Sequence, residues 1–478
     1  MSQAAAAVPL IQAGSAREIF NRQRAAYLKN PYLTLAERCQ ALMAIETLLV
    51  DNQKEIAEAI CRDFGNRSLH ETKLLEIFPT VSGLANARRR LKKWMRPQHR
   101  HVSFWFMGAK NSVIPQPKGV VGIISPWNYP MQLAVSPLTS ALAAGNRCMI
   151  KMATHSQGLC HLLHRLTSLV LPDELVAFLP GVPASEFTSL PFDHLIFTGS
   201  PRSGKMIMKT AADNLTPVTL ELGGKSPAIV ASDFDIDKAA DRLLYLKYMN
   251  AGQTCVAPDY LFLPENRVEA FVEKARKLIQ TRYPRLDTDD YTSIIDASAF
   301  ARLMDCLQDA RAKGAKVINL LPGAEPDEGL RKIPPTLVLD VTDDMALMQK
   351  EIFGPLLPVK TYQDLNQAIA YIKGRQRPLA LYLFTNDRAI QEKVVFNTMS
   401  GGVCINDCAM HVAQHDLPFG GIGNSGMGHY HGYEGFVEFS KLRPVFKQAP
   451  IPASAFLFPP YGKTFERIYR LMIKMRWL

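Results

Sequence analysis

Residues 194–214 read HLIFTGSPRSGKMIMKTAADN, and this stretch decides the fold class. Its first part, HLIFT, is a short apolar run of the kind that forms a buried strand. A glycine-containing turn follows, and the remainder, SGKMIMKTAADN, is helix-like. A strand that leads directly into a helix is the repeating unit of α/β proteins with a parallel sheet.

Similar apolar runs occur on both sides of this stretch and alternate with helix-like segments. They are VVGII at 120–124, RCMIK at 147–151 and SPAIV at 226–230. Helix-like sequence dominates up to about residue 95, whereas residues 101–116 alternate in polarity and suggest an arm or hairpin. At roughly 150 residues per domain, a chain of 478 residues predicts about three domains around parallel sheets.

Composition and cysteine usage are those of a globular protein in a reducing compartment. Hydrophobic residues make up 47% and charged residues 21% of the chain. The eight cysteines form no CxxC pair and no zinc-like cluster, so we expect free thiols, no metal and a cytoplasmic location. Residues 1–17 lack the basic start of a secretory signal. The uncharged run Gly119–Asn146 contains three prolines, which favours a strand, a loop and a packed helix over a membrane span.

The net charge of +11 comes from two clusters. Residues 86–100 hold seven cations and no acid, which would suit nucleic acid or a membrane, but a solvated helix face is favoured because no aromatic residues interleave. Residues 463–478 hold five cations against one acid on a basic amphipathic helix. We expect that helix to pack across a subunit or over the substrate entrance, with peripheral membrane contact as the less favoured alternative.

Three residues predict covalent chemistry on a carbonyl group. Cys255, in NAGQTCVAP, is a candidate nucleophile, and Glu221, in VTLELGGKSP, is a candidate base. Asn128, in SPWNYP, is a candidate donor to the oxyanion that forms on attack. Taken singly, a buried cysteine, a surface carboxylate and a turn asparagine are the more frequent interpretations. The sequences that flank these three residues favour the catalytic interpretation instead.

Two glycine-rich stretches imitate nucleotide-binding loops. Residues 421–426, GIGNSG, match the dinucleotide fingerprint but follow a loop and do not open a helix. Residues 199–205, GSPRSGK, nearly match a P-loop, but Met206 stands where a magnesium-binding hydroxyl is required. Neither predicts an ATP site, although the second stretch could receive a cofactor diphosphate at the start of its helix.

Six motifs together resemble the aldehyde dehydrogenase superfamily, in that family's order and from about residue 118 to 440. They are PWNYP around Asn128, FTGS at 197–200, ELGGKSP around Glu221, GQTC ending at Cys255, EIFGP at 351–355 and PFGGIGNSG at 418–426. The stretches RPLALYLF at 377–384 and PPY at 459–461 resemble the branch that holds the class 3 enzymes and the bacterial coniferyl aldehyde dehydrogenases.

The resemblance implies a Rossmann-type parallel-sheet cofactor domain, an α/β catalytic domain and a small β bridging arm. Residues 1–100 and 117–219 would form the cofactor domain and 220–397 the catalytic domain. Residues 101–116 and 398–445 would form the bridging, oligomerisation region of a homodimer, and 446–478 a tail with the basic helix.

The resemblance also implies the cofactor residues. Those matching the family's NAD(P) contacts are Lys151, Gly199, Ser200, Gly204, Glu351 and Phe353. Thr154 departs from the pattern, because NAD-preferring relatives place a glutamate there that would repel the 2′-phosphate of NADP. We therefore expect NAD or NADP to serve.

The implied reaction is oxidation of an aldehyde to a carboxylic acid through a thiohemiacetal and a thioester on Cys255. The branch points to coniferyl aldehyde, giving ferulate, with fatty or other aromatic aldehydes as alternatives. Tyr129 and Met131 could line the substrate tunnel or pack in the core. A cofactor-independent cysteine hydrolase would need a histidine base, for which His411 and His415 show no paired signature. A silent structural protein would be expected to have lost one catalytic residue, and none is lost.

Overall fold

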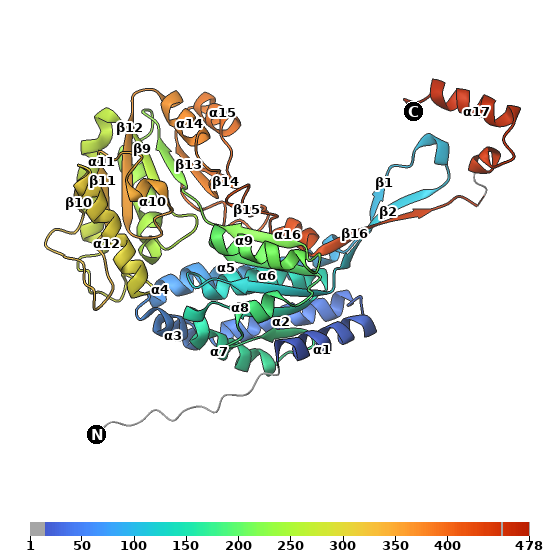
Figure 1. Cartoon of the computed structure of the whole chain (residues 1–478), viewed down its shortest axis with the longest axis horizontal. Helices are drawn as coiled ribbons and strands as arrows, with labels where there is room; N and C mark the ends of the chain where they lie inside the picture. Colours follow the sequence, from blue (N-terminus) through green and yellow to red (C-terminus); the bar gives the residue numbers. More distant parts are fainter. Residues whose placement is uncertain (1–14, 451–452, 478) are drawn as a thin grey trace.

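The computed structural model describes residues 15–450 and 453–477, so the expectation about an export signal in residues 1–17 lies mostly outside the described residues. Two sheets flanked by helices form the body, and a third, three-stranded sheet projects from it as an arm (Figure 1). The predicted α/β class with parallel sheets is confirmed.

The first sheet has six strands in the order β15-β7-β6-β3-β4-β5. All neighbours are parallel except β15, which runs antiparallel to β7. The strands are β3 (Val120–Ser125), β4 (Arg147–Met152), β5 (Val176–Phe178), β6 (His194–Gly199), β7 (Val218–Leu222) and β15 (Gly426–Met427). In β3, Val121 and Ile123 pack into one apolar cluster while Val120 and Ile124 pack into another, so both faces are covered.

Helices from the first half of the chain surround this sheet. They are α1 (Ala16–Lys29), α2 (Leu35–Asp51), α3 (Gln53–Phe64), α4 (Leu69–Thr72), α5 (Phe78–Trp94), α6 (Pro130–Ala144), α7 (Gln157–Ser168), α8 (Ala184–Thr188) and α9 (Pro201–Ala212). Helix α9 follows β6 directly, as the opening stretch predicts. One π-helical turn, Lys73–Ile77, joins α4 to α5, a feature that is frequent near functional sites.

The second sheet has seven strands in the order β10-β11-β12-β9-β8-β13-β14. Its strands are β8 (Pro227–Val230), β9 (Tyr260–Pro264), β10 (Lys316–Asn319), β11 (Thr336–Leu339), β12 (Leu356–Tyr362), β13 (Ala380–Phe384) and β14 (Gly402–Ile405). Only β10 is antiparallel to its neighbour. The accompanying helices are α10 (Ile236–Tyr248), α11 (Val268–Arg282), α12 (Ala297–Ala312), α13 (Ala346–Gln349), α14 (Leu365–Lys373) and α15 (Arg388–Asn397).

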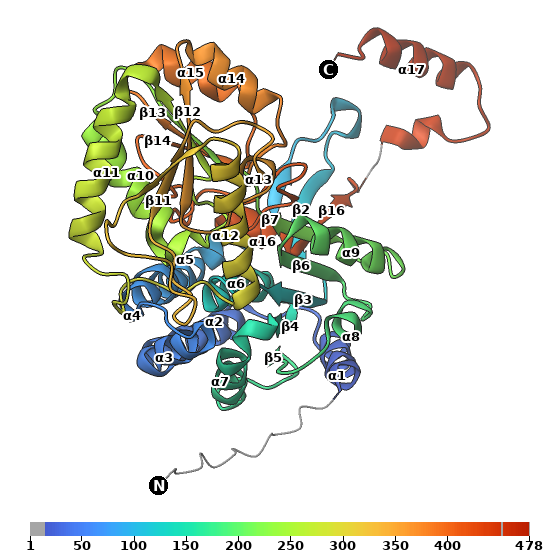
Figure 2. The same ribbon diagram turned by 60° about the vertical axis from the view of Figure 1, so that its left-hand side comes forward.

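The arm is built from β1 (Gln98–Arg100), β2 (Lys110–Pro117) and β16 (Ser440–Lys447), all antiparallel. The hairpin predicted at 101–116 is present in this form, and its tip is a single 3-10 turn at Phe104–Phe106. Helix α16 (Gly432–Glu438) leads from the body into β16. Helix α17 (Lys463–Lys474) follows at the end of the chain and stands clear of the body in both views (Figures 1 and 2).

Within residues 15–450 and 453–477, no helix has both the length and the hydropathy needed to cross a bilayer. The first basic cluster lies largely on α5. It is partly neutralised there, because Arg88 pairs with Glu46 at 3.2 Å and Arg90 with Asp416 at 2.8 Å.

Candidate active site

Cys255 lies just after a strained turn. Helix α10 ends at Tyr248, and Asn250, Ala251 and Gly252 then all have positive φ, at 51°, 51° and 77°. A Cβ atom on Gly252 would come within 2.2 Å of the Gly354 carbonyl oxygen, so only glycine fits there. Strain of this kind persists where the surrounding structure holds a functional residue in place. Here it turns the chain so that Cys255 is half-buried.

The thiol of Cys255 is poorly disposed to ionise by itself. Burial raises its pKa to about 12, and the neighbouring carboxyl groups of Glu351 and Glu221 add to the rise. The backbone amides of Cys255 and Val256 act in the opposite direction. Cys255 therefore needs either a proton acceptor or a nearby positive charge to become a thiolate.

Asn128 is tied to the chain beside Cys255. It lies between β3 and α6, is 3% exposed, and its side-chain amide donates to the Gln253 carbonyl at 3.1 Å. The backbone carbonyl of Asn128 accepts from Arg67 at 2.6 Å and from the Asn250 side chain at 3.2 Å. One hydrogen of the Asn128 amide remains for an oxyanion next to the thiol.

Glu221 lies in β7, opposite Gly426 of β15. Its side chain is buried, and neither carboxyl oxygen has a hydrogen-bond partner among the described residues. Burial raises its pKa well above the ordinary value, and the charge of Glu438 adds to the rise. A buried carboxyl group without partners is costly to keep, and such groups cluster at catalytic sites. Its influence on the pKa of Cys255 places it within electrostatic reach of the thiol.

Three supporting residues were missed by sequence reasoning, because no motif marks them. Arg67 and Glu76 form an ion pair at 3.0 Å in which both side chains are fully buried. Glu76 also accepts from the backbone amides of Met131 and Gln132 at the first turn of α6. Glu71 accepts from the backbone amide of Asn250 at 3.0 Å and so supports the strained turn. These residues hold the two loops that carry Asn128 and Cys255.

The two residues after Asn128 that were considered for the tunnel have separate roles. Met131 is fully buried in the larger apolar core, which settles the alternative in favour of packing. Tyr129 is 7% exposed, and its hydroxyl lies 2.7 Å from that of Thr254. Tyr129 therefore fixes the residue immediately before the nucleophile.

The carboxyl edge of the first sheet presents the predicted cofactor residues. Ser200 caps α9 by accepting from the amide of Ser203, and the Gly204 amide donates to the Ser200 carbonyl at 2.9 Å. Because Pro201 has no N–H, the Arg202 amide is the one left in this first turn for an anion. A Cβ atom on Gly204 would lie 2.9 Å from a methyl group of Leu222, so this position packs α9 closely against β7. Lys151 is buried at the end of β4, and Thr154 is exposed just beyond it. Ligands of open α/β sheets bind at this edge.

Glu351 and Phe353 reach the same region from the second sheet. A cleft contains Glu351, Gly223 and Pro201, whereas Lys151 and Thr154 lie outside its lining. Burial raises the pKa of Glu351 to about 8, and a Cβ atom on Gly223 would lie 2.2 Å from its carboxyl oxygen. Phe353 has a positive φ of 49° and packs edge-on against Trp127 at 5.4 Å between ring centroids.

These features fit a dinucleotide. The start of α9 offers the Arg202 amide to a diphosphate, and the carboxyl group of Glu351 can accept hydrogen bonds from ribose hydroxyls. Among residues 15–450 and 453–477, no group of three or more histidine, cysteine or acidic side chains could hold a metal ion. Two histidines were considered for a hydrolase. Among the described residues, His411 has no hydrogen-bond partner on either ring nitrogen, and His415 lies 3.0 Å from the Ser82 hydroxyl, so no hydrogen bond links either one to Cys255.

The fold and the site together define an α/β oxidoreductase of the NAD(P)-dependent type. Residues 2–445 match the aldehyde dehydrogenase family, and the chain belongs to that family. The resemblance predicted from the six motifs is confirmed, and the protein is an aldehyde-oxidising enzyme.

Two relatives and one solved structure are similar to this chain over almost its whole length. The probable coniferyl aldehyde dehydrogenase of Pseudomonas aeruginosa is 50% identical, over 95% of this chain and 96% of that protein. The coniferyl aldehyde dehydrogenase of Pseudomonas sp. strain HR199 is 45% identical, over 97% and 96%. A substrate-bound structure of Staphylococcus aureus AldH superimposes with a TM-score of 0.90 at 34% identity, covering 96% of this chain and 100% of that chain.

Proposed function

We propose that this aldehyde dehydrogenase oxidises coniferyl aldehyde to ferulate with NAD or NADP. The observation that carries the proposal is a half-buried Cys255 directly after the strained turn 250–252, together with the unpartnered carboxyl group of Glu221, whose charge helps to raise the pKa of the thiol. The two relatives named above as coniferyl aldehyde dehydrogenases support the substrate. Fatty and other aromatic aldehydes are the competing substrates.

Cys255 attacks the aldehyde carbon as a thiolate, and a carbon–sulfur bond forms while the carbonyl oxygen becomes an alkoxide. The free hydrogen of the Asn128 amide and a backbone amide near Cys255 donate to that oxygen. Each such donor lowers the barrier by about 3 to 4 kcal/mol in comparable sites. A nicotinamide held by Glu351 and Phe353 would accept the hydride from the carbon bonded to Cys255, and a thioester would then remain on Cys255.

Glu221 acts mainly in the second half of the reaction. As a carboxylate it takes a proton from a water molecule, whose oxygen attacks the thioester carbon. The carbon–sulfur bond then breaks, and the acid and the Cys255 thiolate are released. The low-dielectric surroundings that raise the pKa of Glu221 also make it a stronger base once it is ionised.

We assign each part of the bound NAD or NADP to a separate group of residues. Gly199, Ser200 and Gly204 receive the diphosphate at α9, Lys151 and Thr154 lie toward the adenosine ribose, and Glu351 and Phe353 hold the nicotinamide ribose and ring. Residues 1–100 and 117–219 then act as the cofactor domain, 220–397 as the catalytic domain, and 101–116 with 398–445 as the bridge, followed by the 446–478 tail.

The test is rapid-mixing kinetics with coniferyl aldehyde, following absorbance of the reduced cofactor. We expect Glu221→Gln to retain the first burst of reduced cofactor and to slow the steady state by at least about a hundredfold. Cys255→Ala should abolish both phases. Loss of the burst in Glu221→Gln would assign Glu221 to the first step as well, and no signal with any aldehyde would refute the proposal.

A homodimer is the proposed assembly. The arm ends in exposed Phe104, Phe106 and Phe446, and β14 is an unpaired edge of the second sheet. In a dimer the second copy would cover both the apolar tip of the arm and this strand edge. We place α17 of one copy against the other copy, near its substrate entrance. The eight free cysteines support a reducing, cytoplasmic location.

A further inference from the structure

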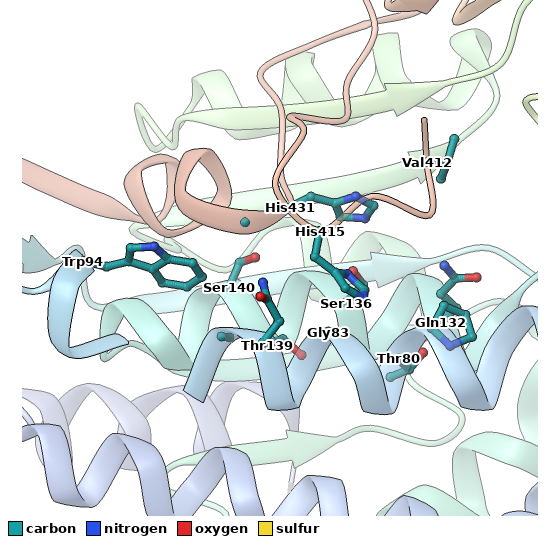
Figure 3. A pocket seen from close by; sticks show the side chains of 14 residues that line it. Thr80, Gly83, Trp94, Gln132, Ser136, Thr139, Ser140, Val412, His415 and His431 are labelled. Carbon is teal, nitrogen blue, oxygen red and sulfur yellow. The ribbon is translucent and has the colours of Figure 1, made fainter. Parts of the chain in front are cut away.

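Two hollows in the molecule differ in what they can hold. One lies between helices α5 and α6 and the segment before α16, where Figure 3 shows Thr80 and His431 in the lining; its volume of about 30 Å³ has room for water molecules and not for a ring. The other is the cleft that contains Glu351, and its volume of about 530 Å³ is that of a small-molecule site. The segment that carries Glu351 into this cleft therefore determines how a ligand is held there.

That segment has no regular structure of its own. It runs from the end of α13, at Gln349, to the start of β12, at Leu356, and it carries both Glu351 and Phe353. Phe353 has a φ of 49°, a left-handed conformation that a residue with a side chain keeps only where its surroundings impose it. The segment therefore depends on bonds from neighbouring elements.

Lys225 holds the segment on the N-terminal side of Glu351. Its ammonium group donates to the carbonyl oxygens of Leu347 at 2.7 Å and Lys350 at 3.1 Å, and also to the carboxyl group of Asp259. An ammonium group has three N–H donors, so Lys225 uses all of them here. Lys225 lies between β7 of the first sheet and β8 of the second, and it thus ties the segment to the crossing between the two sheets.

Asp259 holds the segment on the other side of Glu351. One oxygen of its carboxyl group accepts from the Ile352 amide at 2.8 Å, and the other accepts from Lys225. The Asp259 side chain is 4% exposed and that of Lys225 is 15% exposed, so solvent competes little for these charge-assisted bonds. The Asp259 amide itself donates to the Ser226 carbonyl at 2.8 Å. Glu351 therefore lies between a carbonyl that Lys225 fixes and an amide that Asp259 fixes.

We propose that the Lys225–Asp259 pair positions Glu351 and Phe353 for the nicotinamide half of the cofactor. The inference rests on the cofactor assignment within the proposed function, and it adds two positioning residues that act through the segment between α13 and β12. A pair that only stabilised the fold would affect every part of the cofactor alike. A positioning pair affects the nicotinamide half and spares the adenosine diphosphate half.

The test measures the dissociation constants of NAD and of ADP by calorimetry, without aldehyde, for the wild type, Asp259→Asn and Lys225→Met. ADP carries the adenosine and the diphosphate but lacks the nicotinamide half. We expect the Kd of NAD to rise by about tenfold in each variant, because the contacts to that half are misplaced, and the Kd of ADP to stay within about twofold. Lys225→Arg keeps a cation beside Asp259 and should weaken NAD binding by less than about threefold.

A second lysine–aspartate pair provides the matched control. Asp309 accepts from the Ala346 amide at 2.7 Å and pairs with Lys313 at 2.8 Å, and Lys313 donates to the Asp344 carbonyl at 2.7 Å. This pair uses the same kinds of bond, but it holds the start of α13, away from Glu351. Asp309→Asn should therefore leave both dissociation constants within about twofold of the wild type.

Three results would overturn the inference and leave the proposed oxidation intact. They are equal weakening of NAD and ADP, unchanged NAD affinity in both Asp259→Asn and Lys225→Met, and a loss in Asp309→Asn as large as that in Asp259→Asn. Thermal melts establish which variants are folded at the assay temperature, and if Asp259→Asn is not, Lys225→Met and Lys225→Arg decide by the same comparison. A wild type that binds neither NAD nor NADP would overturn the proposed function and this inference together.

Discussion

Glu221 must be ionised to act as a base, yet two features of its surroundings oppose ionisation. The larger is burial, and the second is Glu438 of α16, whose carboxyl oxygen accepts from the Thr219 hydroxyl at 2.6 Å. A base with a raised pKa becomes active only as the pH rises through that pKa. The deacylation rate should therefore increase with pH, and the position of the rise reports the charge on Glu438.

We predict that Glu438→Gln moves the rise in the kcat–pH profile to lower pH. Removing a nearby negative charge lowers the pKa of Glu221, so a larger fraction of it is ionised at a given pH. The plateau at high pH should change little. Glu434→Gln, on the same helix, is the control and should leave the profile in place. A shift to higher pH, or equal shifts in both variants, would contradict this account.

Thr154 is exposed just beyond β4, where we propose that the adenosine ribose of the cofactor lies. We predict that Thr154→Glu lowers kcat/KM for NADP by about tenfold or more while changing the value for NAD by less than about twofold, because a carboxylate there repels a 2′-phosphate. Thr154→Gln has nearly the same shape without the charge and should leave the NADP/NAD ratio near that of the wild type. If the NADP turnover of Thr154→Glu equals that of the wild type, the ribose does not bind beside Thr154.

At the scale of elements, the start of α6 depends on a buried ion pair. Arg67 bonds the carbonyl of Asn128, and Glu76 bonds the first amides of α6. Breaking one partner of a buried pair costs about 3 to 5 kcal/mol, because the other charge stays unpaired. We predict that Glu76→Gln lowers the thermal midpoint clearly and reduces kcat/KM, since Arg67 loses the partner that positions it under Asn128.

Glu46→Gln is the matched control for this element. The Arg88–Glu46 pair is partly exposed, at 36% and 20% of its side chains, so its loss should cost under about 1 kcal/mol and leave kcat/KM unchanged. Differential scanning calorimetry and steady-state kinetics on both variants give the comparison. Equal stability of the two variants would mean that the Arg67–Glu76 pair contributes no more than a surface pair.

These elements also mark what the sequence could and could not predict. The strands of both sheets that are buried on two faces appear as continuous apolar runs, such as VVGII at 120–124, and the helix after β6 follows from local composition. The family and its reaction follow from short motifs. Arg67 and Glu76 could not be found, since Arg67 contacts Asn128, 61 residues away, and Glu76 lies in a π-helical turn and contacts Met131, 55 residues away. Thr80 and His431 likewise line one pocket although they are far apart in the sequence, so no local pattern predicts that they lie together.

At the scale of the whole molecule, the arm and the terminal helix leave surfaces that a single copy does not cover. Helix α17 has no buried residue, and Tyr469, Leu471 and Ile473 are each 49% exposed. An isolated helix of 12 residues is marginal in water, so this one needs a surface to pack against. Its apolar side could meet a second copy or, with its lysines and arginines, an anionic membrane.

We predict that α17 packs against the second copy of the chain. Hydrogen exchange of the α17 amides should be slow at protein concentrations where the dimer prevails and should accelerate on dilution, because the helix loses its packing when the copies separate. Adding vesicles of anionic phospholipid should not alter exchange or pellet the protein. A chain ending at Gly462 is the control. Its mass by light scattering should still be that of a dimer, because the arm remains. Its kcat/KM for coniferyl aldehyde should change if α17 borders the substrate entrance of the neighbouring copy. Pelleting of the full chain but not of the shortened one would instead assign α17 to the membrane, since the two proteins differ only in that segment.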